Sequence, residues 1–161
     1  MTATRVALLA ALAACGGRAP APAAPVGPPI DATWAALDGG EVRLAELRGQ
    51  RVVLHLFTTW AAAADLDNDQ LAAADAADDV VVVAVALDAE GYTMVTPWRR
   101  ATGVGFLVAL ADDATRAGAG PLGPVREVPT TLVLDRSGRI VARLEHQLAP
   151  GELARTIART R

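Results

Sequence analysis

The chain of 161 residues contains no lysine, one cysteine, one serine and two histidines. Without lysine, neither a Schiff base nor a lysine nucleophile is possible. The single cysteine, Cys15, excludes a disulfide within the chain. The single serine, Ser137, stands beside Gly138, where a turn role is expected rather than nucleophilic attack. The formal net charge is −3 and basic residues do not cluster, so we expect no nucleic-acid partner.

Aromatic residues are also scarce, at 4% of the chain, whereas 52% of the residues are apolar. Much of that apolar content is alanine, so the core is expected to consist of valine, leucine and alanine. The tryptophans Trp34, Trp60 and Trp98 are expected to be its large fillers. The length allows one domain with a sizeable core, together with accessory segments.

The first 14 residues are typical of a signal peptide. Arg5 is the one positive charge, and the apolar run 6–14 has about half the length of a membrane-spanning helix. Residues 12–15, Leu-Ala-Ala-Cys, resemble the bacterial lipobox, which implies that Cys15 is lipidated and becomes the mature N-terminus. A plain secretory signal that ends near a cysteine is the alternative. Gly16 is not the aspartate that commonly signals inner-membrane retention, which favours the outer membrane.

Residues 15–30 consist mainly of glycine, alanine and proline, the composition of a tether. The sequence therefore predicts three parts: a signal peptide over 1–14, a tether over 15–30 and a folded domain over 31–161. Its predicted location is the cell envelope, lipid-anchored through Cys15 and facing the periplasm.

Strands in the domain are predicted from apolar runs bounded by turn residues. Asp38-Gly39-Gly40 and residues 135–138 are expected to turn two hairpins, since Asp-Gly and Ser-Gly supply the conformations that tight turns need. The run 80–87 is unbroken and suits a central strand covered on both faces. The predicted strands are 32–37, 41–44, 52–57, 80–87, 106–110, 130–134 and 139–144.

Three helices are predicted. The alanine-rich segment 61–77 is expected to form one continuous helix. A second helix is expected to begin with Thr96 as its cap and Pro97 in its first position. The last covers 151–160, with Leu153 and Ile157 facing inward.

Candidate metal ligands are few. Asp65, Asp67 and Asp69 have the spacing that opens a calcium loop, but the later glycine and glutamate of such a loop are missing, so they are interpreted as offsetting the helix dipole. His55 lies in a predicted strand, where a packed, hydrogen-bonded side chain is expected, and His146 is expected at the surface. We expect no metal and no cofactor.

Three segments together resemble the thioredoxin-like superfamily, in its TlpA-like (thiol-disulfide oxidoreductase) branch. Residues 52–60, VVLHLFTTW, are similar to the strand and turn that precede the redox cysteine pair of that branch. Residues 128–131 match its VPTT motif, which implies a cis Pro129, and residues 134–141, LDRSGRIV, match its turn. The resemblance covers 31 to the C-terminus and implies an α/β fold, with a mixed central sheet flanked by helices and an N-terminal β-hairpin.

The resemblance places the two redox cysteines at Ala61 and Ala64. Thiol-disulfide exchange needs a thiolate and a second, resolving thiol, and alanine supplies neither. Cys15 cannot replace them, because its sulfur would carry the lipid and it lies at the far end of the tether. An engineered replacement would leave the same residues, although four consecutive alanines in an alanine-rich chain favour a native sequence.

Two functions are therefore considered. The first is a redox-inactive protein-binding or scaffold module, whose partner is an extended polypeptide or an envelope protein. Its binding surface would comprise Thr59, Trp60, Val128, Pro129 and Thr130, the positions where the family docks extended chains. The alternative is a thiol-disulfide oxidoreductase of the redoxin family, acting in cell redox or disulfide metabolism.

Overall fold

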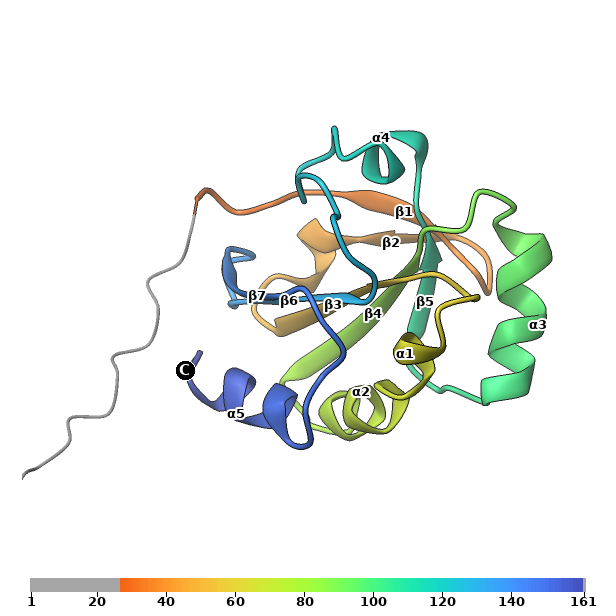
Figure 1. Ribbon diagram of the computed structural model, residues 1–161. Coiled ribbons are helices and arrows are strands. Elements are labelled where there is room, and N and C mark those ends of the chain that lie inside the picture. Colours follow the sequence, from red (N-terminus) through yellow and green to blue (C-terminus); the bar gives the residue numbers. More distant parts are fainter. Residues whose placement is uncertain (1–26, 161) are drawn as a thin grey trace, which may run out of the picture.

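The computed structural model describes residues 27–160, which form a seven-stranded sheet with helices packed against it (Figure 1). The strands are β1 (Thr33–Ala36), β2 (Glu41–Arg43), β3 (Arg51–Phe57), β4 (Val80–Ala86), β5 (Leu107–Leu110), β6 (Thr130–Leu134) and β7 (Ile140–Leu144). The helices are α1 (Ala62–Asp65), α2 (Asn68–Asp75), α3 (Tyr92–Thr102), α4 (Asp113–Arg116) and α5 (Glu152–Ala158), with a 3-10 turn η1 (Leu44–Leu47).

The sheet has the order β2-β1-β5-β4-β3-β6-β7 and is mixed. Strands β3, β4 and β5 run parallel, whereas β6 is antiparallel to β3 and β7 is antiparallel to β6. Every residue of β3 is buried, and so is almost all of β4, as expected for central strands covered on both faces. The predicted hairpins, central strands and α/β sheet are therefore confirmed.

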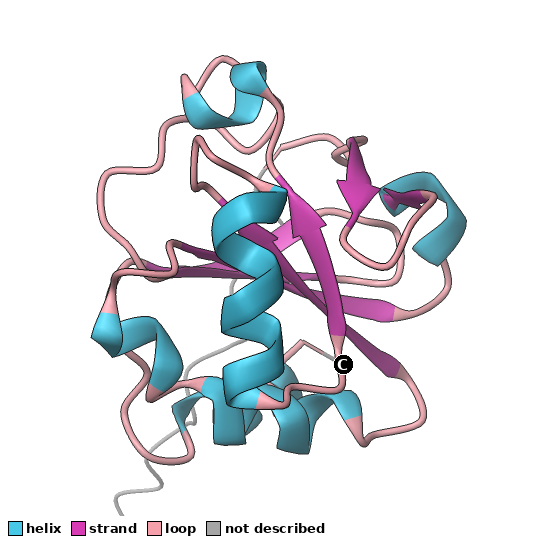
Figure 2. Cartoon of the chain, turned by 90° about the vertical axis from the view of Figure 1, so that its right-hand side faces the viewer, coloured by secondary structure: helices cyan, strands magenta, loops and turns pink. Residues whose placement is uncertain are grey.

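Two apolar clusters cover the two faces of the sheet. One face carries α1, α2, α3 and α5, whose buried side chains include Leu71, Trp98 and Leu153. Leu153 and Ile157 of α5 both face inward, as predicted. The cluster on the other face includes Trp34 of β1 and Val42 of β2, together with Leu44 and Leu122. Figure 2 looks onto α3, which crosses in front of the sheet.

The prediction of one continuous helix over 61–77 is wrong. It is divided into α1 and α2 at Leu66 and Asp67. The Asp67 side chain is completely buried and accepts a hydrogen bond from the backbone N–H of Leu148 at 3.0 Å. The chain therefore turns Asp67 toward the core at the division, where alanine propensity alone predicts an unbroken helix.

The predicted start of the next helix at Thr96 is also wrong. Helix α3 begins five residues before Pro97, after Gly91, and carries the proline within it. Val95 and Trp98 are buried on its inner face, whereas Pro97 is exposed. Packing of that face extends the helix in front of the proline, although a proline is favoured in the first turn.

The predicted signal peptide and lipidation at Cys15 lie outside the described residues, as does most of the predicted tether. Its last residues contact the domain: Ile30 is buried and its N–H donates to the carbonyl of Gly138 at 2.8 Å. Arg48 donates to the Ile30 carbonyl at 2.6 Å. The packed region thus includes Ile30, one residue before the predicted domain start. No helix within residues 27–160 has the length and apolarity needed to cross a membrane.

Candidate functional site

The candidate site lies where β3 ends and β6 begins. Leu56 of β3 pairs with Thr130 of β6, so the residues after Phe57 and those before Thr130 leave the sheet at the same edge. The peptide bond between Val128 and Pro129 is cis, as the family resemblance implies. The fold therefore brings together the two segments that the sequence singled out.

The two positions where the family resemblance expects cysteines hold methyl groups. Ala61 is the residue before α1, is half-buried and makes no side-chain cap, while Ala64 lies within α1 at 1% exposure. A methyl group has no proton to give up and no lone pair with which to attack a disulfide. No cysteine occurs among residues 27–160, so the described domain contains no thiol.

The turn after β3 is held by Asp88, which the sequence analysis did not identify. The Asp88 carboxylate is 4% exposed and accepts the backbone N–H of Thr59 at 3.0 and 3.1 Å. It also accepts the Thr59 hydroxyl at 2.7 Å. The only signal in the sequence is an aspartate just after the apolar run of β4, and its partner lies 29 residues earlier. Thr59 therefore fixes the turn and is not a free side chain.

The predicted binding residues differ in their accessibility. Trp60 is 73% exposed, so its expected role as a core filler is wrong. Val128 is half-buried and Pro129 is buried. Thr130 is fully buried, and its hydroxyl donates to the carbonyl of Glu127 at 2.6 Å. A partner at this edge would therefore meet the side chains of Trp60 and Val128, whereas that of Thr130 is inaccessible.

Helix α1 is held in place by Trp98 of α3, which packs against Phe57 of β3. The rings of Phe57 and Trp98 have centroids 4.5 Å apart, and the Trp98 indole N–H donates to Asp65 at 2.7 Å. Asp65 was interpreted from the sequence as an offset to the helix dipole, but it has this specific partner. The short helix that carries Ala64 is therefore hydrogen-bonded to α3, which in turn packs on β3.

His55 lies in the middle of β3, on the same face as Phe57, and is packed and hydrogen-bonded as predicted. Its Nδ1 is 3.0 Å from the hydroxyl of Thr131, and its ring stacks at 6.1 Å from that of Phe57. Burial lowers the pKa of His55 to about 4, so the imidazole is neutral at pH 7. His146 is exposed, as predicted, with its Nε2 3.2 Å from the Glu152 carboxylate.

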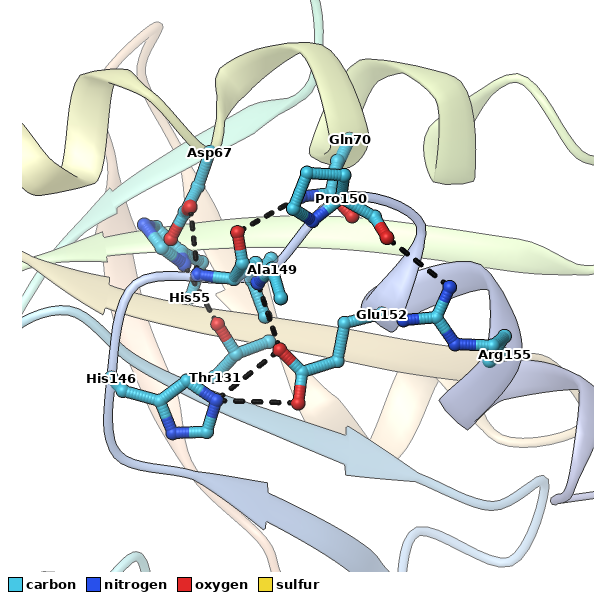
Figure 3. Close-up of polar contacts among 10 residues, drawn as sticks. His55, Asp67, Gln70, Thr131, His146, Ala149, Pro150, Glu152 and Arg155 are labelled. Atoms are coloured by element: carbon cyan, nitrogen blue, oxygen red, sulfur yellow. Dashed lines mark hydrogen bonds and ion pairs between the residues drawn. The ribbon is translucent and has the colours of Figure 1, made fainter.

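Asp67, which was interpreted from the sequence as offsetting the helix dipole, is a buried carboxyl group. Figure 3 shows it reaching from the start of α2 toward the segment that precedes α5. In that segment, the backbone N–H of Leu148 donates to it. Burial raises the pKa of Asp67 to about 6; Glu152 adds to the rise, and the Leu148 N–H and His146 oppose it. This group changes its charge within the neutral to mildly acidic range.

The arrangement offers little for metal chemistry. Within the described part of the chain, no three side chains of His, Cys, Asp or Glu are grouped closely enough to hold a metal ion. The absence of a cofactor stays a prediction from the sequence.

Solved structures similar to this one share the thioredoxin fold. A DsbF homologue from Corynebacterium diphtheriae has 21% identity and a TM-score of 0.69, over 91% of this chain and 96% of that one. The thioredoxin domain of a thiol-disulfide oxidoreductase from Bacteroides vulgatus has 13% identity and a TM-score of 0.71, over 86% and 99%. A secreted Mycobacterium tuberculosis disulfide oxidoreductase has 19% identity and a TM-score of 0.65, over 79% and 94%. No protein-family model and no curated sequence matches the chain.

These similarities confirm the thioredoxin-like fold that the sequence predicted. At such identities they establish the fold alone. Two of these neighbours are named as disulfide oxidoreductases, and none of the three names indicates a redox-inactive scaffold or a lipid anchor. In this chain, positions 61 and 64 are alanine.

Proposed function

We propose that this protein is a thioredoxin-fold binding module of the bacterial cell envelope that holds extended polypeptide without thiol chemistry. The observation that carries the proposal is the presence of alanine at positions 61 and 64, at the start of α1, in a domain without any cysteine. The site nevertheless keeps a well-supported turn, because Asp88 holds Thr59.

The proposed contact surface consists of Trp60 and Val128, with Ala61 between the exposed ring and α1. Trp60 presents a large ring at 73% exposure, and aromatic anchors of this kind dominate many binding surfaces. Ala61 and Val128, both half-buried, add an uncharged, apolar border. An extended chain with apolar side chains fits such a surface better than a charged ligand does.

Binding is tested with a reduced, carboxymethylated unfolded protein, a probe that offers extended chain but no free thiol. Trp60→Ala is expected to weaken its binding at least ~10-fold, because it removes the exposed anchor. The matched control is Leu107→Ala, which removes another exposed apolar side chain, 44% exposed, from β5. Equal binding by wild type and Trp60→Ala would contradict the proposed surface.

The oxidoreductase alternative rests on the structural neighbours named above. A turnover assay with insulin and dithiothreitol separates the two, and the wild type is expected to match a buffer blank. The double variant Ala61→Cys/Ala64→Cys is expected to acquire activity, since the fold already positions both residues at the helix start. The single variant Ala61→Cys, which lacks the resolving thiol, is the control. Wild-type turnover above the blank would overturn the proposal.

Anchoring through Cys15 at the outer membrane, facing the periplasm, is part of the same proposal. Its support is the lipobox-like sequence of residues 12–15. Labelled palmitate is expected to enter the wild type but not Cys15→Ser, and fractionation is expected to place the labelled protein with outer membranes. A soluble, unlabelled wild type would contradict the lipid anchor and would leave the proposed binding surface unaffected.

A further inference from the structure

Helix α1 has an exposed apolar side chain next to each of its ends. Trp60 is 73% exposed shortly before the helix, and Leu66 is 66% exposed directly after it. Within residues 27–160, these are the two most exposed of the large apolar side chains. Because the four residues of α1 span only about 6 Å, the two lie close enough for one extended chain to meet both.

Carboxylates accompany this apolar surface. Three segments leave the sheet at the same edge, namely 58–66, 87–91 and 126–129. Asp65 ends α1, Glu90 follows β4 and Glu127 precedes β6, and all three are exposed. A fourth carboxylate, that of Asp88, is buried beneath the turn. None of the four forms an ion pair with another residue in 27–160.

The charge at this edge is therefore negative on balance. The same three segments contain one basic residue, Arg126. The opposite edge of the sheet differs, because its carboxylate Asp79 accepts hydrogen bonds from both Arg51 and Arg136. Carboxylates are thus paired within the chain at the amino end of β3 and are left without a cationic partner at its carboxyl end.

We propose that the polypeptide bound at this surface is basic. Its apolar side chains meet Trp60 and Leu66, and lysine or arginine side chains beside them meet Glu90 and Glu127. The inference rests on the proposed function and names the class of its ligand. An apolar centre with a charged rim is the usual anatomy of an interface, and complementary charge at the rim selects the partner and speeds its encounter. An acidic chain would place like charges side by side.

The test measures the affinity of the full chain for three short fluorescent peptides. They share a centre of leucines and differ in the flanking residues, which are lysine, glutamine or glutamate. At pH 7 the lysine peptide is expected to bind at least ~10-fold more tightly than the glutamate peptide, with the glutamine peptide between them. Salt at about 1 M, where the Debye length is about 3 Å, is expected to remove most of the difference. Equal affinities at low salt, or tighter binding of the glutamate peptide, would overturn the inference.

The exposed carboxylates are tested by neutral variants. Glu90→Gln and Glu127→Gln are each expected to weaken the lysine peptide about 3-fold, and the double variant about 10-fold, while the glutamine peptide stays within ~2-fold. The matched control is Asp78→Asn, which removes an exposed carboxylate from the opposite end of β4. The seven residues of β4 separate it from Glu90 by about 20 Å, well beyond the Debye length of about 8 Å. Unchanged affinity for the lysine peptide in the folded double variant would overturn the inference.

Apolar variants distinguish this inference from the proposed function. Leu66→Ala and Trp60→Ala are expected to weaken all three peptides alike, since they remove apolar contacts but no charge. If the three peptides bind equally and Trp60→Ala weakens all of them, the binding surface stands and the preference for a basic chain is wrong. If no peptide binds the wild type, both the surface and the preference are wrong.

Discussion

The two ends of β3 present opposite kinds of surface. At its carboxyl end the chain projects outward: Trp60 is 73% exposed above a turn that Asp88 holds. At its amino end the surface is hollow, and Arg51 lies beside a cavity of about 330 Å³. A projecting aromatic ring suits a macromolecule, whereas a half-open cavity of this volume suits a smaller ligand.

The carboxyl end also combines the geometry of the thioredoxin fold with different side chains. The carboxyl end has the turn after β3, the cis Pro129 and helix α1, but the two positions where the family resemblance expects cysteines are alanine. The amino end lies beside the LDRSGRIV turn, since Val52 pairs with Leu134 and Arg136 donates to Asp79, the partner of Arg51. Within residues 27–160, it also has buried polar atoms of Arg51 and Gln70 without a partner.

The largest expected effect concerns the amino end. Arg51→Met removes a buried guanidinium and leaves the carbonyl of Ile157 without its donor. Because Asp79 is partly exposed and keeps Arg136, we expect a loss of about 3 kcal/mol in unfolding free energy, the lower limit for breaking a buried ion pair. Urea denaturation measures it. A loss below about 1 kcal/mol would show that Arg51 contributes little to folding.

Two buried groups, His55 in the middle of β3 and Asp67 between α1 and α2, are expected to make the unfolding free energy depend on pH. The pKa of His55 is lowered from 6.5 to about 4, so its contribution to stability is lost as pH falls from 6.5 to 4. The pKa of Asp67 is raised from 3.8 to about 6, so its contribution is present in acid and is lost as pH rises through 6. Each amounts to about 3 kcal/mol, and the two oppose each other between about pH 4 and 6.

Single variants distinguish the two opposing pH dependences of stability. Relative to wild type, His55→Asn is expected to gain stability as pH is lowered from 7 to 4, because only Asp67 still titrates abnormally. Asp67→Asn is expected to lose stability over the same range. Denaturation at several pH values measures both, and each variant serves as the other's control, since all other carboxylates are common to both. Parallel pH profiles would contradict the assignment.

At the carboxyl end, Asp88→Ala removes the acceptor of the Thr59 backbone and hydroxyl. Because Thr59 is only half-buried and can be hydrated, we expect a loss of about 2 kcal/mol. Asp88→Asn keeps one oxygen acceptor and is expected to lose about half as much. Thermal and urea denaturation check the order; a neutral Asp88→Ala would show that the turn is held without this carboxylate.

The smallest expected effect is that of Trp60→Ala on stability. An exposed side chain away from buried contacts changes unfolding free energy by no more than about 0.5 kcal/mol. The same variant is expected to weaken polypeptide binding, so the two measurements together distinguish a binding residue from a structural one. A large loss of stability would mean that Trp60 packs more closely than its exposure indicates.

Local patterns in the sequence were sufficient for the central strands, the hairpins and the final helix. The runs at β3 and β4 are apolar throughout, and Asp-Gly and Ser-Gly turns mark the hairpins, so neighbouring residues alone carry this information. The sequence also determined the absence of thiols at the site, because Ala61 and Ala64 need no structure to be identified.

Only the tertiary structure decided which polar residues hold the site and which border the cavity. Asp67 meets Leu148 across 81 residues of sequence, Thr59 meets Asp88 across 29 and Arg51 meets Ile157 across 106. The helix break at Asp67, the fixed turn at Thr59 and the chamber beside Arg51 all follow from such contacts. They depend on which strands and helices become neighbours in space, and no local pattern of residues specifies that.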